Sequence, residues 1–328
     1  MCTAISCNNG HFYFGRTLDY EVQFGESIVV MPRHFPLIDR YQQTNADHYA
    51  VIGMAHVANA YPLYYDAVNE KGLAMAGLNF VGYAKYGKPL SGKENIASFA
   101  FIPRVLAQCA NLEEAKAFLK NVQLTDDAFS EQLPPAQLHW LIADKEESIT
   151  VESVSDGLRI YPNPVGVLTN NPPFPQQMLN LRNYMQLTPG DPTNQFCKTL
   201  DLQPYSRGMG ALGLPGDLSS QSRFVRAAFT KLNSICDDSE GSSVSQFFHI
   251  LETVSQTRGC CRLPDGKHEI TIYSSCCSAG RGIYYYTTYD NRQITAVDLH
   301  SENLDGHELL SYPLLQEQNI HPQNFTWS

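Results

Sequence analysis

The sequence predicts an α+β fold in which antiparallel sheets pack together and helices are segregated outside them. Two observations lead to this class. Short runs rich in β-branched and aromatic residues fill most of the first ninety positions and return later in the chain. Segments with helical periodicity form separate blocks between these runs. A parallel sheet of βαβ units would require strands and helices to alternate, so the block order favours antiparallel sheets.

The first predicted strands are joined by short turns. An Asn-Asn-Gly sequence at residues 8–10 predicts a hairpin between the first two strands. Another turn is predicted from Asn-Glu-Lys-Gly at residues 69–72. The predicted strands cover residues 2–7, 11–18, 26–32, 49–58 and 72–80.

Helical spacing replaces the strand pattern over residues 95–122, where Asn111 and Glu114 resemble the capping box of a second helix. Strands are expected again within residues 138–170. No repeat or low-complexity linker interrupts the chain, so residues 1–328 are predicted to form a single domain. Later helices are predicted over residues 175–187, 219–235 and 243–256, and final strands over residues 269–275, 282–289 and 293–299.

The composition disfavours several classes of protein. A net charge of −10 argues against nucleic acid or an anionic membrane as a partner, because either would require a basic surface. No segment has the pattern of a signal peptide or the length of a membrane span, which predicts a cytoplasmic protein. The nine cysteines are then expected to be free thiols, and the scattered histidines lack zinc-binding spacing, so no metal is expected.

Cys2 is the first candidate for chemistry. Removal of Met1 would leave a thiol and a free α-amine on one residue, and an amine that titrates near neutral pH can act as the base for its own thiol. The alternative is an ordinary buried cysteine of the first strand. Arg16 and Asp19 lie on the returning strand of the hairpin, where a guanidinium would favour the thiolate and a carboxylate would orient the amine. Each of them alone could instead be half of a structural salt bridge.

Acyl transfer also requires donors directed at the developing oxyanion. Asn79, Asn170 and Asn171 lie at predicted strand ends, where asparagine is also common as a turn residue. Residues 208–213 match GxGxxG, but no helix follows them, so a dinucleotide cofactor is not expected. His139 lies in an apolar strand and is expected to be a core histidine rather than a ligand or a base.

These candidates occur together with longer motifs, namely AGLNF at residues 76–80, GVLTNNP at residues 166–172 and LPGDLSSQSRFVRA at residues 214–227. In this combination and order, the chain closely resembles the choloylglycine hydrolase family of N-terminal nucleophile hydrolases over nearly its whole length. The resemblance implies a four-layer αββα sandwich, in which two antiparallel sheets are flanked by helices. It also implies assembly as a homotetramer.

The resemblance further implies how the residues around Cys2 act. Cys2 would be the nucleophile and its own amine the base, and Asp19 would orient that amine. Arg16 and Arg223 would supply positive charge around the thiolate and the substrate. No metal or organic cofactor would take part.

The implied substrates are conjugated bile salts of the taurocholate and glycocholate type, whose amide bond would be hydrolysed through a thioester. Asn79 and Asn170 would form the oxyanion hole. Penicillin V acylases of the family typically carry tyrosine at the position of Asn79, so this residue favours the bile salt hydrolases. Four apolar residues match positions that line the steroid pocket of relatives, although each could be an ordinary core residue: Leu18, Phe24, Phe129 and Leu133.

Ser206 and Arg207 resemble the Ser-Arg form of a loop that is associated with taurine conjugates in this family. An arginine offers several donors to a permanently ionised sulfonate, so a preference for taurine conjugates is predicted.

Two other functions are compatible with these residues. A penicillin V acylase-like or acyl-homoserine-lactone amidase would use the same cysteine on another substrate. A non-catalytic binding protein for amphipathic acids would result if Met1 stayed on the chain, because the free amine would then belong to the wrong residue. A redox or metal role for the cysteine pairs at residues 260–261 and 276–277 is a more distant alternative.

Overall fold

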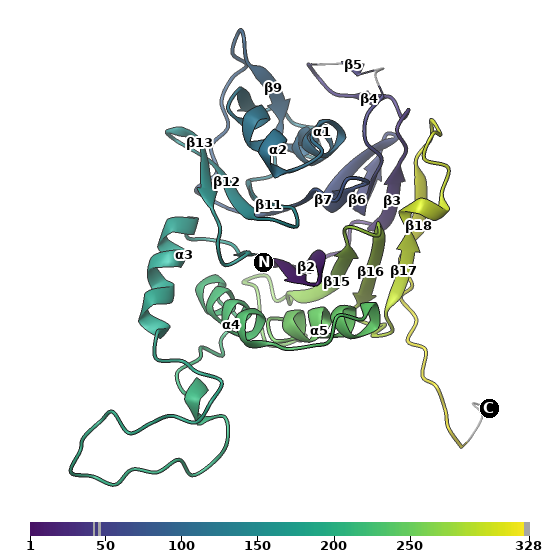
Figure 1. Ribbon diagram of the computed structural model, residues 1–328. Helices are drawn as coiled ribbons and strands as arrows, with labels where there is room; N and C mark the ends of the chain where they lie inside the picture. The colour runs from purple at the N-terminus through teal and green to yellow at the C-terminus, as the bar shows by residue number, and fades with distance from the viewer. Residues whose placement is uncertain (42, 45–46, 325–328) are drawn as a thin grey trace.

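Two antiparallel sheets form the centre of the computed structural model, which describes residues 1–41, 43–44 and 47–324 (Figure 1). Within these residues the first sheet has six strands, in the order β14 (Val167–Leu168), β1 (Cys2–Asn9), β2 (His11–Tyr20), β15 (Ile270–Ser278), β16 (Ile283–Thr288) and β17 (Thr295–Asp298). The second sheet of the described chain has eight, in the order β13 (Gly157–Pro162), β12 (Ser148–Val154), β11 (Leu138–Ala143), β8 (Ala74–Asn79), β7 (Tyr61–Asn69), β6 (Val51–Ala58), β3 (Ser27–Met31) and β18 (Leu310–Pro313).

Helices cover the outer faces of the two sheets. Figure 1 shows α1 (Phe101–Gln108) and α2 (Leu112–Leu119) beyond the second sheet, and α4 (Ser220–Asn233) and α5 (Glu240–Glu252) beyond the first. Another helix, α3 (Phe174–Leu181), lies at one side. The order is therefore helix, sheet, sheet, helix, and the predicted four-layer αββα sandwich is confirmed. The single domain expected over residues 1–328 stays a prediction.

The predicted hairpin at the N-terminus forms as expected. Gly10 has a positive φ of 68°, a conformation that glycine adopts without steric cost, and it lets β2 return antiparallel to β1. Cys2 pairs with Leu18, and Ala4 pairs with Arg16. The turn therefore brings residues 16–19 back to the start of the chain.

The helical block predicted from residue 95 is corrected at both of its ends. Residues Glu94–Ala97 form strand β9, which pairs in parallel with β10 (Val122–Thr125), and a short 3-10 helix at Ser98–Ala100 leads into α1. Short apolar runs satisfy strand and helix patterns alike, so periodicity did not separate them. Inside the block, the Asn111 side chain accepts a hydrogen bond from the Glu114 N–H at 3.0 Å, which confirms the predicted cap of α2.

Strand β7 was absent from the strands predicted along the chain. Its second residue, Pro62, is unfavourable inside a sheet and obscured the pattern. The register between β6 and β7 shifts between Met54 and Ala55, whose partners are Asp66 and Tyr64, so Tyr65 is an extra residue. The carbonyl of Tyr65 in this bulge accepts a hydrogen bond from Arg16 of β2 at 3.1 Å, and such bulges commonly redirect side chains near functional sites. A further short pair, β4 (Leu37–Ile38) and β5 (Gln43–Thr44), lies outside the main sheets.

Candidate active site

A cavity of about 260 Å³ opens beside the first residue of β1. Its walls are mostly aromatic and aliphatic, with a few polar groups among them. This is the composition expected of a pocket for a largely apolar ligand. Seven of the twelve predicted site residues line it: Cys2, Arg16, Leu18, Phe24, Asn79, Phe129 and Leu133.

Cys2 lines this cavity and is almost fully buried, with 2% of its surface exposed. Its main-chain N–H donates to Oδ1 of Asn170 at 2.8 Å. Met1 precedes it, and the α-amine of Met1 donates to the main-chain oxygen of Asp19 at 2.5 Å and pairs with the carboxylate of Glu269. In this form of the chain the free amine is therefore on Met1, and the nitrogen of Cys2 is an amide.

Arg223, from α4, is fully buried and fixes the main chain around Cys2. Its Nη1 donates to the Cys2 carbonyl at 2.5 Å and to the Thr3 hydroxyl at 2.6 Å, and its Nη2 donates to Oδ1 of Asn170 at 2.7 Å. Burial lowers the pKa of Arg223, while the negative charge of Asp19, 4.0 Å away, opposes that shift. Arg223 thus joins Cys2, Asn170 and Asp19 in one buried cluster.

The carboxylate of Asp19 is held by hydroxyl groups. It accepts hydrogen bonds from Thr271 at 2.6 Å and from Thr17 at 3.1 Å. Burial raises the pKa of Asp19, and the charges of Arg223 and the N-terminal amine oppose that rise. Met1 contacts the main-chain oxygen of Asp19, so the predicted contact between the Asp19 carboxylate and the amine of Cys2 stays a prediction.

Asn170 and Asn79 are joined by a hydrogen bond. Nδ2 of Asn170 donates to the main-chain oxygen of Asn79 at 2.8 Å, and Oδ1 of Asn170 accepts from Cys2 and Arg223. One of the two N–H groups on Nδ2 of Asn170 is therefore already used in a hydrogen bond. The predicted oxyanion role of Asn170 would require the other N–H, together with the side chain of Asn79, which lines the cavity.

His139 supports the loop that carries Asn170. It is fully buried, stacks on Phe80 with ring centroids 4.3 Å apart, and makes a 2.8 Å hydrogen bond from Nε2 to the carbonyl of Thr169. The prediction of a core histidine is confirmed.

Ser206 and Arg207 lie elsewhere. Both are exposed on the long segment between α3 and α4, which projects from the body of the molecule (Figure 1), and neither lines the cavity with Cys2. Their predicted contact with the substrate therefore stays a prediction.

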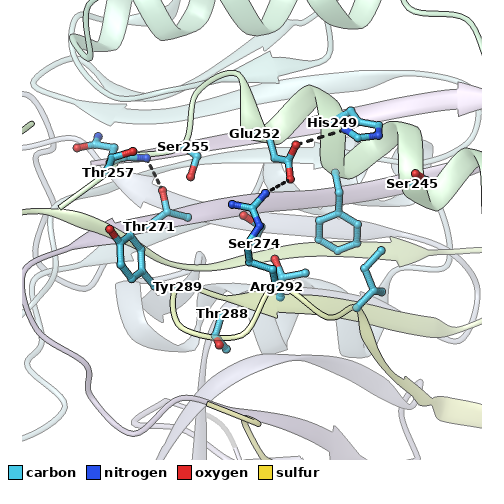
Figure 2. A pocket seen from close by; sticks show the side chains of 14 residues that line it. Ser245, His249, Glu252, Ser255, Thr257, Thr271, Ser274, Thr288, Tyr289 and Arg292 are labelled. Atoms are coloured by element: carbon cyan, nitrogen blue, oxygen red, sulfur yellow. Dashed lines mark hydrogen bonds and ion pairs between the residues drawn. The ribbon is translucent and has the colours of Figure 1, made fainter. Parts of the chain in front are cut away.

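A second cavity of about 380 Å³ lies under α5, and none of the twelve predicted site residues lines it (Figure 2). Its walls combine polar side chains with apolar ones such as Phe248 and Ile294. Figure 2 shows His249 and Arg292 on either side of Glu252, at 3.3 Å and 2.8 Å from its carboxylate oxygens. Thr271 lines this cavity and also donates to Asp19, so it connects the second cavity to the cluster behind Cys2.

Several buried or half-buried residues of the cluster were missed by sequence reasoning. Thr17 and Thr271 bind Asp19, Glu269 binds the N-terminal amine, and Ser220 accepts a hydrogen bond from the main-chain N–H of Asn170 at 2.8 Å. Ser220 lies within the motif at residues 214–227 but was not singled out, and Thr17, Thr271 and Glu269 belong to none of the motifs named above. Apart from the local contact of Thr17 with Asp19, their roles depend on contacts between distant segments.

Comparison with known proteins relates this site to a family. The sequence model of the linear amide C–N hydrolases, choloylglycine hydrolase family, matches residues 2–312. The chain is 55% identical over 324 residues to a bile salt hydrolase/transferase of Lactiplantibacillus plantarum, with 99% of this chain and 100% of the relative covered.

Solved structures agree with this relationship. The fold matches a variant of the conjugated bile acid hydrolase from Clostridium perfringens with a TM-score of 0.91 and 38% identity, covering 98% of this chain and 100% of the other. A penicillin V acylase from Agrobacterium tumefaciens matches with a TM-score of 0.73 and 20% identity, covering 95% and 90% of the two chains, and it supports the fold alone.

Proposed function

Because this chain belongs to the choloylglycine hydrolase family of linear amide C–N hydrolases, we propose that it hydrolyses the amide bond of conjugated bile salts. The products would be a free bile acid and taurine or glycine. The observation that carries the proposal is the position of Cys2 in the wall of a mostly apolar cavity. A rigid amphipathic acid could lie along the apolar walls with its amide carbonyl against the sulfur. The names of the similar proteins from Lactiplantibacillus plantarum and Clostridium perfringens support the same substrate class.

The proposed mechanism begins once Met1 has been removed. The amine of Cys2 takes the thiol proton, and the thiolate, near the guanidinium of Arg16, attacks the amide carbon. The N–H groups of Asn79 and Asn170 stabilise the tetrahedral oxyanion. The ammonium then protonates the leaving nitrogen as the C–N bond breaks, which releases taurine or glycine and leaves a thioester. The same amine removes a proton from water, whose oxygen attacks the thioester and frees the bile acid and Cys2.

Release of the amine product from a substrate panel tests the substrate class. The panel pairs taurocholate and glycocholate with penicillin V and an acyl homoserine lactone, and compares kcat/KM. We expect the two bile salts to be preferred by at least tenfold. A preference for penicillin V or the lactone would contradict the proposal and assign the chain to another substrate class.

Substitution of Phe129 tests the apolar part of the cavity. Its ring packs against Phe99 and Tyr61, with centroids 5.2 Å and 5.8 Å away. Phe129→Ala is expected to raise KM for taurocholate about tenfold with little change in kcat, because the lost apolar contact is made equally in the ground state and the transition state. The alkylation rate of Cys2 serves as a control and should stay at the wild-type value. A KM within twofold of wild type would contradict the assignment.

The taurine preference is proposed to depend on Arg207 of a neighbouring subunit. Arg207 does not line the cavity of its own chain, but its segment exposes large apolar residues, which favours contact with another copy. Phe196 and Tyr205 are 85% and 84% exposed. The predicted homotetramer would provide this contact, and light scattering checks its mass. The cytoplasmic location likewise stays a prediction.

Substitution of Arg207 tests this arrangement. Arg207→Ala is expected to lower the ratio of kcat/KM for taurocholate over glycocholate about tenfold, through loss of charge-assisted hydrogen bonds to the sulfonate. Lys198→Ala removes a charge from the same segment and should leave the ratio unchanged. An unchanged ratio in Arg207→Ala would remove Arg207 from substrate recognition.

A further inference from the structure

Asp66 is a buried carboxylate that the proposed mechanism does not use. It lies on β7, is 1% exposed, and connects the two sheets through contacts with β15 and β16. Three hydroxyl groups donate to it: Tyr284 at 2.6 Å, Tyr273 at 2.7 Å and Ser275 at 3.0 Å. A buried carboxylate is costly unless it is paired and hydrogen-bonded, so this convergence of donors requires a reason.

Arg16 is the cation whose positive charge favours the ionised form of Asp66. Its side chain is 1% exposed, and its Nη1 donates to the carbonyls of Gly77 at 2.5 Å and Tyr65 at 3.1 Å. Its Nε donates to the carbonyl of Thr17 at 3.2 Å. These neutral partners fix the position of the guanidinium but do not balance its charge.

The third guanidinium nitrogen of Arg16, Nη2, does not bind a main-chain carbonyl of the described residues. Nη2 is buried and has no hydrogen-bond partner among the residues that the structure describes, and Arg16 lines the cavity together with Cys2. An unpaired N–H of a buried guanidinium beside a cavity is available to an anion there.

The charges around Arg16 come from several strands. Burial opposes its positive charge, but Cys2 from β1, Tyr273 from β15, Asp66 from β7 and Asp19 from β2 outweigh that effect and raise the pKa of Arg16. Around Asp66 the charged and titratable groups are Arg16, Tyr273, Tyr284 and Cys277. Burial raises the pKa of Asp66, and Arg16 and the three hydroxyls oppose that rise.

The bulge in β7 positions both the guanidinium of Arg16 and the carboxylate of Asp66. The bulge in β7 makes Tyr65 an extra residue, and its carbonyl binds Arg16 while the next side chain, Asp66, points to the hydroxyls of the other sheet. The Asp66 carboxylate therefore lies one residue along β7 from the carbonyl that binds Arg16, and the negative charges of Cys2 and Asp66 both raise the pKa of Arg16.

We propose that Asp66 is a positioning residue that acts on Cys2 through Arg16: it is the buried counter-ion that shares the charge of Arg16 with the Cys2 thiolate. The proposal rests on the role of Cys2 as nucleophile. Without Asp66, the whole charge of Arg16 would act on the thiolate, which would form at lower pH. A thiolate stabilised in this way is also a weaker nucleophile. Asp66 thus keeps Cys2 reactive.

The pH profile of Cys2 alkylation tests the proposal. The rate of modification by iodoacetamide is followed on the N-terminal peptide by mass spectrometry, in protein whose intact mass shows loss of Met1. In Asp66→Asn the midpoint should fall by about one pH unit. The limiting rate at alkaline pH should fall about threefold. The wild-type and variant profiles should therefore cross, whereas a purely structural role would lower the melting temperature and leave the midpoint unchanged.

If Asp66→Asn does not fold, the variant Tyr284→Phe tests the role of Asp66 instead. Tyr284→Phe removes one donor to Asp66 and should shift the midpoint in the same direction by a smaller amount. Tyr13→Phe is the matched control, because its hydroxyl donates to Glu240 at 2.9 Å and not to Asp66. A folded Asp66→Asn with the wild-type midpoint, or in its absence a Tyr284→Phe profile identical to that of Tyr13→Phe, would overturn the proposal.

Alkylation requires no bile salt, so this test is independent of the substrate class. If the protein failed to hydrolyse taurocholate while the alkylation profiles of wild type and Asp66→Asn crossed, the proposed function would be contradicted and the role of Asp66 supported. Normal hydrolysis of taurocholate, with the same alkylation profile in wild type and Asp66→Asn, would support the proposed function and contradict the role of Asp66.

Discussion

Cys2→Ala is expected to lower kcat for hydrolysis of taurocholate by about 10⁶-fold, the usual cost of removing the nucleophile from an acyl-transfer site. The fold should survive, because alanine fits the space of the buried cysteine at the start of β1 and the main-chain bond from residue 2 to Asn170 does not involve the sulfur. Release of taurine over time measures the loss, and the melting temperature verifies that the protein is folded.

Cys7→Ala provides the matched control for this prediction. Cys7 lies on the same strand, is partly buried, and does not line the cavity that contains Cys2. It should keep activity close to that of wild type. If Cys2→Ala retained more than a tenth of wild-type activity, a different group would have to act as nucleophile.

The N-terminal part of the site follows from local sequence. The Asn-Asn-Gly turn at residues 8–10 forces β2 back along β1, so the approach of residues 16–19 to Cys2 is a consequence of one hairpin. The cap at Asn111 is equally local. Patterns within about ten residues determine these features, and they were predicted correctly.

The remainder of the site depends on contacts that no local pattern contains. Tyr273 and Tyr284 meet Asp66 across separations of 207 and 218 residues, and Arg223 reaches the carbonyl of Cys2 across 221. In the sequence, the tyrosines of β15 and β16 resemble any alternating strand. Only the packing of one sheet on the other distinguishes their hydroxyls from ordinary core groups. Arg223 was identified because it belongs to a longer motif shared with the family.

A chain that retains any residue before Cys2 is expected to be inactive. With Met1 present, the nitrogen of Cys2 belongs to a peptide bond, so it has no basic lone pair and only donates to Asn170 at 2.8 Å. The α-amine lies instead on Met1, against the carbonyl of Asp19 and the carboxylate of Glu269. Cleaving an N-terminal extension directly before Cys2 should therefore raise taurine release by about 10²–10⁴-fold, the usual contribution of a general base. Intact mass before and after cleavage verifies the new terminus.

The same cleavage applied to Cys2→Ala is the control and should produce no gain, because it exposes an amine without a thiol. Equal activity before and after cleavage of the unsubstituted chain would show that another group removes the thiol proton, and Glu269, whose carboxylate lies beside the terminal amine, would become the base to test. A cleaved chain that stayed inactive on bile salts while Cys2 reacted normally with iodoacetamide would have a working nucleophile. In that case the fault would lie in the fit of the steroid to the cavity, and the proposed substrate class, not the N-terminal mechanism, would be wrong.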